Sequence, residues 1–446
     1  MGKNKIANLL IEKLAFPNVG IAFDLERNKN IYVKGTLPSQ LVEVYIKKDK
    51  GQLLKILEPS KEEITSLCED FLFCGGCSFQ NIPYDYEIQL KEEMALSLYK
   101  DYDYNYLGFE KATEIEGYRN KMEYSFGDSQ KGGKLALGMR KRGCGYEVVT
   151  SKHCNIVDDD YRKILNITLD YFTNTDLQFY HKKLKTGSLR HLVVRRSKYT
   201  NQILINLITT SNFNLDLAPF VDKLLNGGLT GTIVSIFHTI NDSVADIVQA
   251  DKLTLIYGTN HFTEKLCGLQ FKISPFSFFQ TNSIGAQKLY DDIKKLVANC
   301  HKKDIIFDLY CGTGTIAQIV SDTCKEVIAI ELVEEAISSA KANAEINNIT
   351  NCTFIAGDVL KEIDNIDKLP DIIILDPPRD GIHKKAITKI IDFGAKNIIY
   401  ISCKPTSLAR DIQIFLQNGY KLTNIKLHDL FPRTYHIETI ALFEKI

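Results

Sequence analysis

The last third of the chain alternates between short apolar runs and helical patterns. Helical stretches such as Glu334–Asn347 separate most of the runs. Because each helix returns the chain to the same edge of a sheet, this alternation predicts an α/β fold with a doubly wound parallel sheet over residues 276–446. The apolar runs, which are typical of buried strands, are Ile305–Leu309, Glu326–Glu331, Thr353–Ile355, Ile372–Leu375, Asn397–Ile401 and Thr439–Phe443.

The rest of the chain predicts two further domains, since 446 residues exceed one typical domain. Residues 1–58 favour a small OB-like β-barrel, with Pro59 marking its end. Residues 59–275 mix a helical pattern at Glu87–Tyr99 with strand-like segments, which indicates an α+β central domain. The β-prone runs of the first domain are Val19–Phe23, Ile31–Val33, Leu41–Ile46 and Leu53–Leu57.

A glycine-rich loop follows the first apolar run of the doubly wound region. Gly312 and Gly314 allow close backbone approach, and the helix that follows favours a negatively charged group at its N-terminus. The segment 312–317 matches the G-x-G-x-x-A fingerprint, which does not separate NAD from S-adenosylmethionine. Glu331, which ends the next run, suits ribose hydroxyls, and Asp358, beyond the third run, suits an adenine edge. The sequence therefore predicts a nucleotide site.

A thiol and a carboxylate end two other runs at the same predicted edge. Cys403 follows Asn397–Ile401, and Pro405 prevents the strand from continuing. Ligands of open α/β sheets bind at this edge, and Cys is a strong nucleophile, although a buried structural thiol is the alternative. Asp376 faces the transferable methyl group in methyltransferase-type sheets, which favours S-adenosylmethionine. Arg379 stands where amino-directed enzymes usually have an aromatic residue, which counts against amino methylation.

A nucleophilic Cys beside a methyl donor suits methylation of uracil at C5. This carbon is weakly nucleophilic until a thiolate adds at C6, and covalent catalysis splits the difficult step in two. A base must then remove the C5 proton so that the thiolate can leave. The polar segment before the last run offers Glu438 or His436 for that role.

Four of the eleven cysteines are organised. Cys68, Cys74 and Cys77 lie close together in the sequence, and Cys154 follows at a distance. Disulfides are rare in cytoplasmic chains, so this spacing predicts a four-cysteine metal site. Tetrahedral zinc and a [4Fe–4S] cluster both use four thiolates, and the spacing leaves the two open.

The charge pattern hints at a polyanion partner although the net charge is zero. Two basic clusters would form a phosphate-backbone track if both lie on the surface. No stretch approaches the roughly 18 apolar residues of a membrane span, so a cytoplasmic protein is expected. The first cluster is Lys131, Lys134, Arg140, Lys141 and Arg142, and the second is Arg190, His191, Arg195, Arg196 and Lys198.

Several motifs in order resemble the RNA uracil-C5 methyltransferase family, which makes 5-methyluridine. The resemblance covers essentially the whole chain, and it adds a TRAM-like identity for the N-terminal barrel. The motifs lie at Ile273–Asn282, Asp308–Gly314, Asp376–Gly381, Ser402–Pro405 and Phe431–Glu438. Lys404 and Arg433 depart from the family pattern, which commonly has Asn after the nucleophilic Cys and His or Gln after Phe-Pro.

The resemblance implies a role for each matching residue. Cys403 would be the nucleophile, Glu438 the base that takes the C5 proton, and Asp376 the group that holds the uracil edge. The S-adenosylmethionine site would be lined by Gln280, Tyr310, Gly312, Gly314, Thr315, Glu331, Asp358 and Asp376.

The resemblance also resolves the metal site. The subgroup with an N-terminal barrel and this Cys pattern modifies 23S ribosomal RNA, and its four cysteines, here Cys68, Cys74, Cys77 and Cys154, hold a [4Fe–4S] cluster. The expected cluster folds the central domain and presents RNA-contacting loops. No obligate protein partner is evident.

Three alternatives stay open at this point. The same chemistry could act on a tRNA uridine. An NAD-dependent oxidoreductase would match the glycine loop but leaves Cys403, Asp376 and Glu438 unexplained. A non-catalytic RNA-binding protein on the same scaffold is disfavoured by the intact Cys403 and Glu438.

Overall fold

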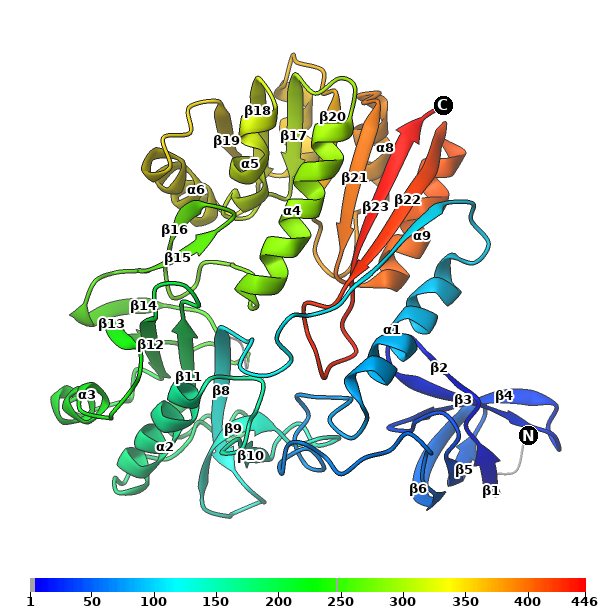
Figure 1. Cartoon of the computed structure of the whole chain (residues 1–446). Coiled ribbons are helices and arrows are strands. Elements are labelled where there is room, and N and C mark those ends of the chain that lie inside the picture. The colour runs from blue at the N-terminus through cyan, green and yellow to red at the C-terminus, as the bar shows by residue number, and fades with distance from the viewer. Residues whose placement is uncertain (1–4, 246–247) are drawn as a thin grey trace.

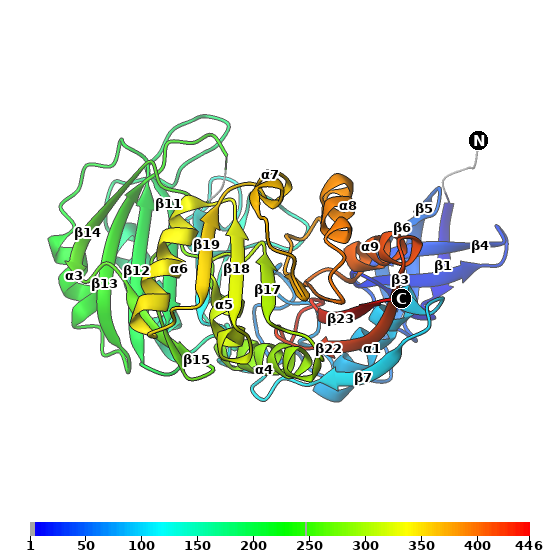
Figure 2. The ribbon, with the colours of Figure 1, turned by 90° about the horizontal axis from the view of Figure 1, so that it is seen from above.

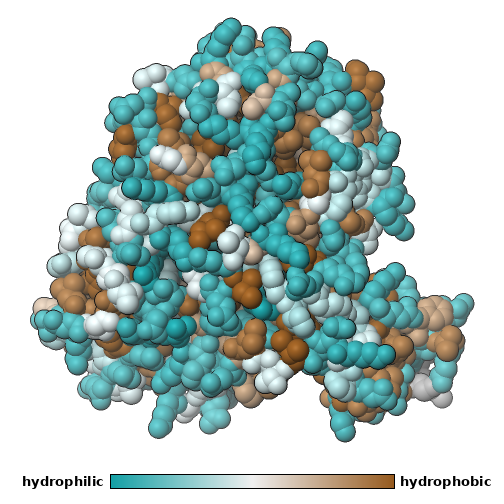
Figure 3. Space-filling model, viewed as in Figure 1, coloured by the Kyte–Doolittle hydropathy of each residue, from teal (hydrophilic) through white to brown (hydrophobic). Residues whose placement is uncertain are grey.

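Three large β-sheets organise the computed structural model, which describes residues 5–245 and 248–446. Figure 1 shows the first sheet beside the N-terminus, the second at the opposite lower side and the third above them. The view from above in Figure 2 places the first and second sheets at opposite ends of the molecule. Polar residues cover most of the face in Figure 3, with scattered apolar residues, some of them over the N-terminal sheet.

The N-terminal sheet is curled, as expected for a small barrel-like domain. Along β5 buried residues alternate with less buried ones, because successive side chains of a strand point to opposite faces. Its six strands run in the order β1-β5-β6-β4-β3-β2, and the four predicted runs lie within β3 to β6. The strands are β1 (Lys5–Leu10), β2 (Lys13–Ala15), β3 (Val19–Asp24), β4 (Lys29–Lys34), β5 (Leu41–Lys47) and β6 (Lys50–Glu58).

A seven-stranded sheet forms most of the central region, in the order β10-β9-β8-β11-β12-β13-β14. Helices α2 and α3 pack on it through apolar residues such as Phe172 and Phe220. The helices and strands between residues 84 and 273, of which β7 belongs to the third sheet, are α1 (Tyr84–Tyr99), β7 (Asn105–Glu110), β8 (Lys121–Asp128), β9 (Leu135–Arg140), β10 (Val148–Thr150), α2 (Asp159–Thr173), β11 (Leu189–Arg196), β12 (Gln202–Thr209), α3 (Ala218–Leu225), β13 (Thr232–Ile240), β14 (Lys252–Gly258), β15 (Phe262–Leu266) and β16 (Leu269–Ile273). Strands β15 and β16 pair as a separate hairpin.

The prediction that the second basic cluster forms a surface track is wrong, because most of its residues are buried. Arg190, His191 and Arg195 are buried in β11. The guanidinium of Arg195 donates to the carbonyls of Ser274 and Ser277, and so fixes the segment that leads into the third sheet. The sequence pattern could not show this. An arginine that is buried and donates to carbonyls cannot be distinguished by sequence from an exposed one.

The third sheet has the order β19-β18-β17-β20-β21-β23-β22-β7. All six predicted apolar runs are strands in it, and the predicted helix is α6. Its elements are α4 (Ser283–Asn299), β17 (Ile305–Leu309), α5 (Thr315–Val320), η1 (Ser321–Thr323), β18 (Glu326–Glu331), α6 (Glu334–Ile346), β19 (Cys352–Ala356), α7 (Val359–Glu362), η2 (Ile363–Asn365), β20 (Ile372–Leu375), α8 (Lys384–Asp392), β21 (Asn397–Ser402), α9 (Pro405–Gln417), β22 (Tyr420–His428) and β23 (Glu438–Lys445).

The predicted parallel arrangement holds from β19 to β21, and the sheet departs from it at β23. Strand β23 runs antiparallel to β21 and to β22. The reason is β22, which the sequence reading missed because its apolar residues alternate with polar ones. The chain turns back through residues 429–437 and inserts β23 between β21 and β22.

Strand β7 adds an outer edge to this sheet from far earlier in the chain. It pairs in parallel with β22, Asn424 lying opposite Asn105. In Figure 1 the cyan β7 lies along the red β22, and α1 lies close to the start of the same edge.

Apolar side chains cover both faces of the third sheet. Ile374 and Ile399 belong to the core on one face, and Ile373 and Ile398 to the core on the other. This is why β20 reads as an uninterrupted apolar run, as strands buried on both faces do. In the described part of the chain, no helix combines the length and the apolar character that a membrane crossing requires.

Candidate functional site

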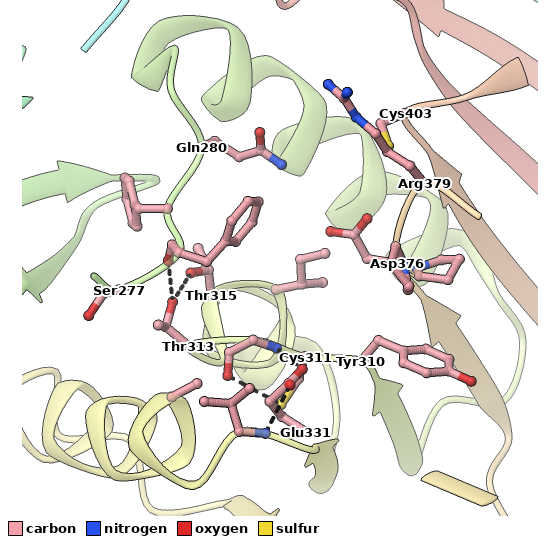
Figure 4. Close-up of a pocket in the computed structure, with 18 of the residues that line it drawn as sticks. Ser277, Gln280, Tyr310, Cys311, Thr313, Thr315, Glu331, Asp376, Arg379 and Cys403 are labelled. Atoms are coloured by element: carbon pink, nitrogen blue, oxygen red, sulfur yellow. Dashed lines mark hydrogen bonds between the residues drawn. The ribbon is translucent and has the colours of Figure 1, made fainter. Parts of the chain in front are cut away.

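A cavity of about 790 Å³ opens at the carboxyl ends of the third sheet. This is the edge where open α/β sheets bind ligands. Figure 4 shows Glu331 and Thr315 on one side of it and Asp376, Arg379 and Cys403 on the other. The predicted residues that line the cavity are Gln280, Tyr310, Gly312, Thr315, Glu331, Asp358, Asp376, Cys403, His436 and Glu438.

Strand register brings Cys403 and Glu438 together. Ser402 at the end of β21 pairs with Thr439 near the start of β23. The next residues outward are Cys403 and Glu438, and the antiparallel ladder therefore directs both chain segments to the same end of the sheet. Asp376 follows Leu375, which pairs with Tyr400 on the neighbouring strand. Three acidic groups from three adjacent strands thus share one site.

These three groups cannot easily all be negative at neutral pH. Burial raises the pKa of Cys403 to about 12, and the charges of Glu438 and Asp376 act in the same direction. Burial also raises the pKa of Glu438 well above its ordinary value, and that of Asp376 to about 7. The raised pKa values favour the protonated forms of the three groups. A nearby cation would favour the ionised forms.

Arg379 supplies such a cation and was missed as a site residue by the sequence reading. Its positive charge lowers the pKa of both Cys403 and Glu438, against the effect of burial. Arg119 also lines the cavity. Its neighbour Tyr118 is buried, and the Tyr118 hydroxyl donates to the carbonyl of Pro432.

The ionisation of Cys403 gives the first prediction. Below a pKa of about 12, the thiolate fraction rises about tenfold per pH unit. Alkylation of Cys403 by iodoacetamide, followed peptide by peptide with mass spectrometry, is expected to accelerate by that factor for each pH unit, or about a hundredfold from pH 7 to pH 9. Arg379→Gln removes the favourable cation, so it should slow alkylation at each pH. A rate that is flat with pH would show that the thiolate is already formed.

The glycine loop is built for close approach of a ligand. Tyr310, Gly312 and Gly314 all have positive φ angles, of 66°, 54° and 68°. The Gly312 amide donates to Oε2 of Glu331, and the Val333 amide donates to Oε1. Two backbone amides thus fix the Glu331 carboxylate at the cavity wall.

Gly314 does not line the cavity. It is the N-cap of α5, and a Cβ atom placed there would come within 2.5 Å of the ring of Phe354 and 2.9 Å of Ala340. Its bare backbone therefore lets α5 pack against β19 and α6. This packing shapes the loop.

Gln280 reaches the cavity from the segment before α4. The amide of Asn120 donates to the Gln280 carbonyl at 3.0 Å and to the Ser283 hydroxyl at 2.8 Å. The central region thereby holds one wall of the cavity in place. Figure 4 shows the Gln280 side chain across the cavity from Cys403.

A buried charge network holds the loop 429–437, which carries His436 and leads to Glu438. The ammonium of Lys91 in α1 lies 2.7 Å from Glu87 and 2.9 Å from Asp429, and all three side chains are fully or almost fully buried. Arg433 donates its backbone amide to Glu87 and its guanidinium to the Ile82 carbonyl. No signal in the sequence linked α1 to this loop, because the partners are more than 300 residues apart.

The four predicted metal-site cysteines line one smaller cavity of about 160 Å³. The Gly76 amide donates to the sulfur of Cys74, and the Gln80 amide donates to that of Cys77. Burial raises the pKa of Cys77 and of Cys154 to about 12. Within residues 5–245 and 248–446, however, no group of three or more His, Cys, Asp or Glu is arranged to hold a metal ion.

The sheet and its cavity define an α/β methyltransferase that takes S-adenosylmethionine. A family model described as tRNA (Uracil-5-)-methyltransferase matches residues 243–446. An uncharacterized RNA methyltransferase of Clostridium tetani is 44% identical, with 99% of this chain and 98% of that protein covered. A second, from Clostridium acetobutylicum, is also 44% identical, over 100% and 99%. The chain belongs to an RNA methyltransferase family, as predicted, and its residues 243–446 match the uracil-C5 methyltransferase model.

The fold also matches a solved structure over nearly its whole length. The tRNA (uracil-54, C5)-methyltransferase of Pyrococcus abyssi, solved with S-adenosyl-L-homocysteine, superposes with a TM-score of 0.78 at 24% identity. The match covers 98% of this chain and all of that one. This likeness extends the shared fold to the part of the chain before residue 243, which the family model does not cover.

Proposed function

We propose that this chain methylates C5 of a uridine in 23S ribosomal RNA through a covalent adduct with Cys403. The observation that carries the proposal is the β21–β23 register, which directs Cys403 and Glu438 to one end of the sheet beside Asp376. A nucleophile, a base and a group that can hold a uracil edge then face one cavity. The bound S-adenosylmethionine supplies an electrophilic methyl group to that cavity.

Once the Cys403 thiol has lost its proton to solvent, the chain's own residues account for the bond to C6 and for the C5 proton. The Cys403 thiolate forms a bond to C6, and the ring electrons move to C5, which takes the methyl group. Glu438 then accepts the C5 proton, the C5–C6 double bond re-forms and the thiolate leaves. Arg379 stabilises the thiolate before attack and again as it leaves.

Glu438 is preferred over His436 as the base. Burial raises the pKa of Glu438 and lowers that of His436 to about 4. The carboxylate is therefore the stronger proton acceptor of the two. Its charge is also the largest electrostatic influence on Cys403, which fits a base close to the reacting ring.

A tRNA uridine is the second candidate substrate. The matching family model and the Pyrococcus structure both carry tRNA in their descriptions. The resemblance of the N-terminal barrel and of the four-cysteine pattern to ribosomal RNA enzymes favours 23S RNA. With either RNA as substrate, the cytoplasm is the proposed place of action.

Methyl transfer from labelled S-adenosylmethionine to unmodified 23S RNA and to unmodified bulk tRNA tests the proposal. We expect 5-methyluridine in 23S RNA, detected by mass spectrometry of nucleosides, and a loss of roughly 10⁴-fold or more for Cys403→Ala. Label in tRNA alone would keep the chemistry and overturn the substrate. Full activity of Cys403→Ala would overturn the covalent route.

We also propose that Cys68, Cys74, Cys77 and Cys154 hold a [4Fe–4S] cluster. The thiols surround a cavity rather than converging on one point. A cluster spreads its four irons over such a space, whereas zinc draws four sulfurs to about 2.3 Å from one centre. The amide donors to Cys74 and Cys77 suit cluster ligands, since hydrogen bonds to the sulfurs tune such sites.

Anaerobic purification tests the cluster. We expect about four irons and four sulfides per chain with broad visible absorbance, and loss of both in Cys154→Ala. Cys144→Ala is the matched control, because Cys144 lies outside this cavity. One tightly bound zinc in a colourless protein would contradict the proposal.

A further inference from the structure

Three loops of the central region meet beside the four-cysteine cavity. They span residues 67–77, 140–147 and 181–186. The Arg142 amide donates to the Phe73 carbonyl at 2.6 Å, and Cys74 forms a β-bridge with Lys141. The ammonium of Lys183 lies 5.0 Å from the centre of the Tyr146 ring. The first and third loops are therefore both tied to the second.

Large apolar side chains on these loops point to solvent. Phe73 is 57% exposed and Tyr146 is 66% exposed, and Leu72 and Leu184 are exposed by 74% and 67%. A single exposed apolar residue is ordinary, but several gathered on adjoining loops indicate a binding surface. We call this group, with the basic residues around it, the Phe73–Tyr146 surface.

Basic residues surround these apolar side chains. The segment 129–142 contains no acidic residue, and neither does 181–186. The acidic residues nearby are Glu147, which is paired with Lys141, and Glu69 and Asp70 of the first loop, which lie 3.4 Å and 3.8 Å from Nδ1 of His153. The basic residues of the surface are Lys131, Lys134, Arg140, Lys141, Arg142, Lys182, Lys183 and Lys185. The first five are the predicted basic cluster that stays at least partly exposed, whereas the second cluster is largely buried.

We propose that the Phe73–Tyr146 surface binds single-stranded nucleotides of the RNA substrate that flank the target uridine. The proposal rests on the proposed function, since it assigns part of the same substrate to a second place on the protein. Exposed aromatic rings stack on bases, and Lys and Arg neutralise the phosphates between them. The ammonium of Lys183 lies 5.0 Å from the centre of the exposed Tyr146 ring, so a cation for a phosphate stands beside a ring for a base.

The test uses the full-length protein and a fluorescein-labelled, 20-nucleotide single-stranded RNA of mixed sequence. Tyr146→Ala is expected to weaken binding about tenfold, and Tyr146→Phe to restore most of the loss, because stacking needs only the ring. Replacing Lys182, Lys183 and Lys185 together by Gln should reduce the slope of log affinity against log salt by roughly two. Tyr257→Ala is the matched control, since β14 lies at the opposite edge of the sheet from β10.

The outcomes separate this inference from the proposed function. Equal affinities of Tyr146→Ala and wild type would overturn the inference, even if 5-methyluridine is formed. A Tyr146-dependent affinity in a protein that makes no 5-methyluridine would uphold the surface and overturn the proposed function. If the Tyr146→Ala loss is matched by Tyr257→Ala, the surface is not specific and the inference is wrong.

Discussion

Glu438→Gln is expected to trap a covalent complex between the protein and its RNA. Gln has nearly the shape of Glu but cannot accept the C5 proton, so the methylated ring stays bonded to Cys403. Turnover should fall by about 10²- to 10⁴-fold, the usual contribution of a general base. The complex is measured as a labelled RNA band that migrates with the protein in a denaturing gel.

The double variant Cys403→Ala/Glu438→Gln is the control for this experiment. It should give no band, because the bond forms through the Cys403 sulfur. Mass spectrometry of the trapped peptide should show both the nucleotide and the added methyl group. Release of 5-methyluridine by Glu438→Gln at the wild-type rate would move the base role to another residue, with His436 next in position at the cavity.

Lys91→Met is expected to destabilise the protein far more than an exposed lysine replacement. It leaves the buried carboxylates of Glu87 and Asp429 without the cation between them. Breaking a buried ion pair in this way costs about 3–5 kcal/mol. The midpoint of thermal unfolding should fall, and the loop 429–437 should become more accessible to proteases.

Two variants make the Lys91 result specific. Lys295→Met removes an exposed lysine, paired with Asp292 at 3.2 Å, and should cost no more than about 1 kcal/mol. The double variant Lys91→Met/Asp429→Asn should recover part of the loss, because the amide that replaces the Asp429 carboxylate carries no charge and Glu87 keeps the buried guanidinium of Arg433 at 3.5 Å. A Lys91→Met protein as stable as wild type would mean that the network contributes little.

The sequence predicted the third sheet well because its strands are buried on both faces. Runs such as Ile372–Leu375 leave little doubt about strand identity, and the predicted run is β20 itself. By contrast, β7 at the edge of the sheet and β22 beside it contain partly exposed residues that break the apolar pattern. The antiparallel insertion of β23 was missed with them, since strand direction depends on connections and not on composition.

The residues of the candidate site could be predicted where they belong to short sequence motifs. Cys403, Asp376 and the glycine loop each end a recognisable strand, and the structure brings them to one cavity. Arg379 and Lys91 were not predicted as contributors, since their effect comes from position in space. The exposed or buried state of basic residues was also beyond the sequence, as Arg195 shows with its guanidinium enclosed by carbonyls.

The position of β7 has a consequence for how the protein is made. This strand leaves the ribosome long before its partner β22, since residues 111–419 must be synthesised in between. At 5–20 residues per second, that interval lasts roughly 15 to 60 s. During this interval the side of β7 that will pair with β22 has no partner strand. The aromatic residues of the segment Asn105–Glu110 must then be shielded from self-association by other parts of the chain. Glu438 arrives with the strand that follows β22, so the closing of the sheet and the completion of the catalytic site coincide in time.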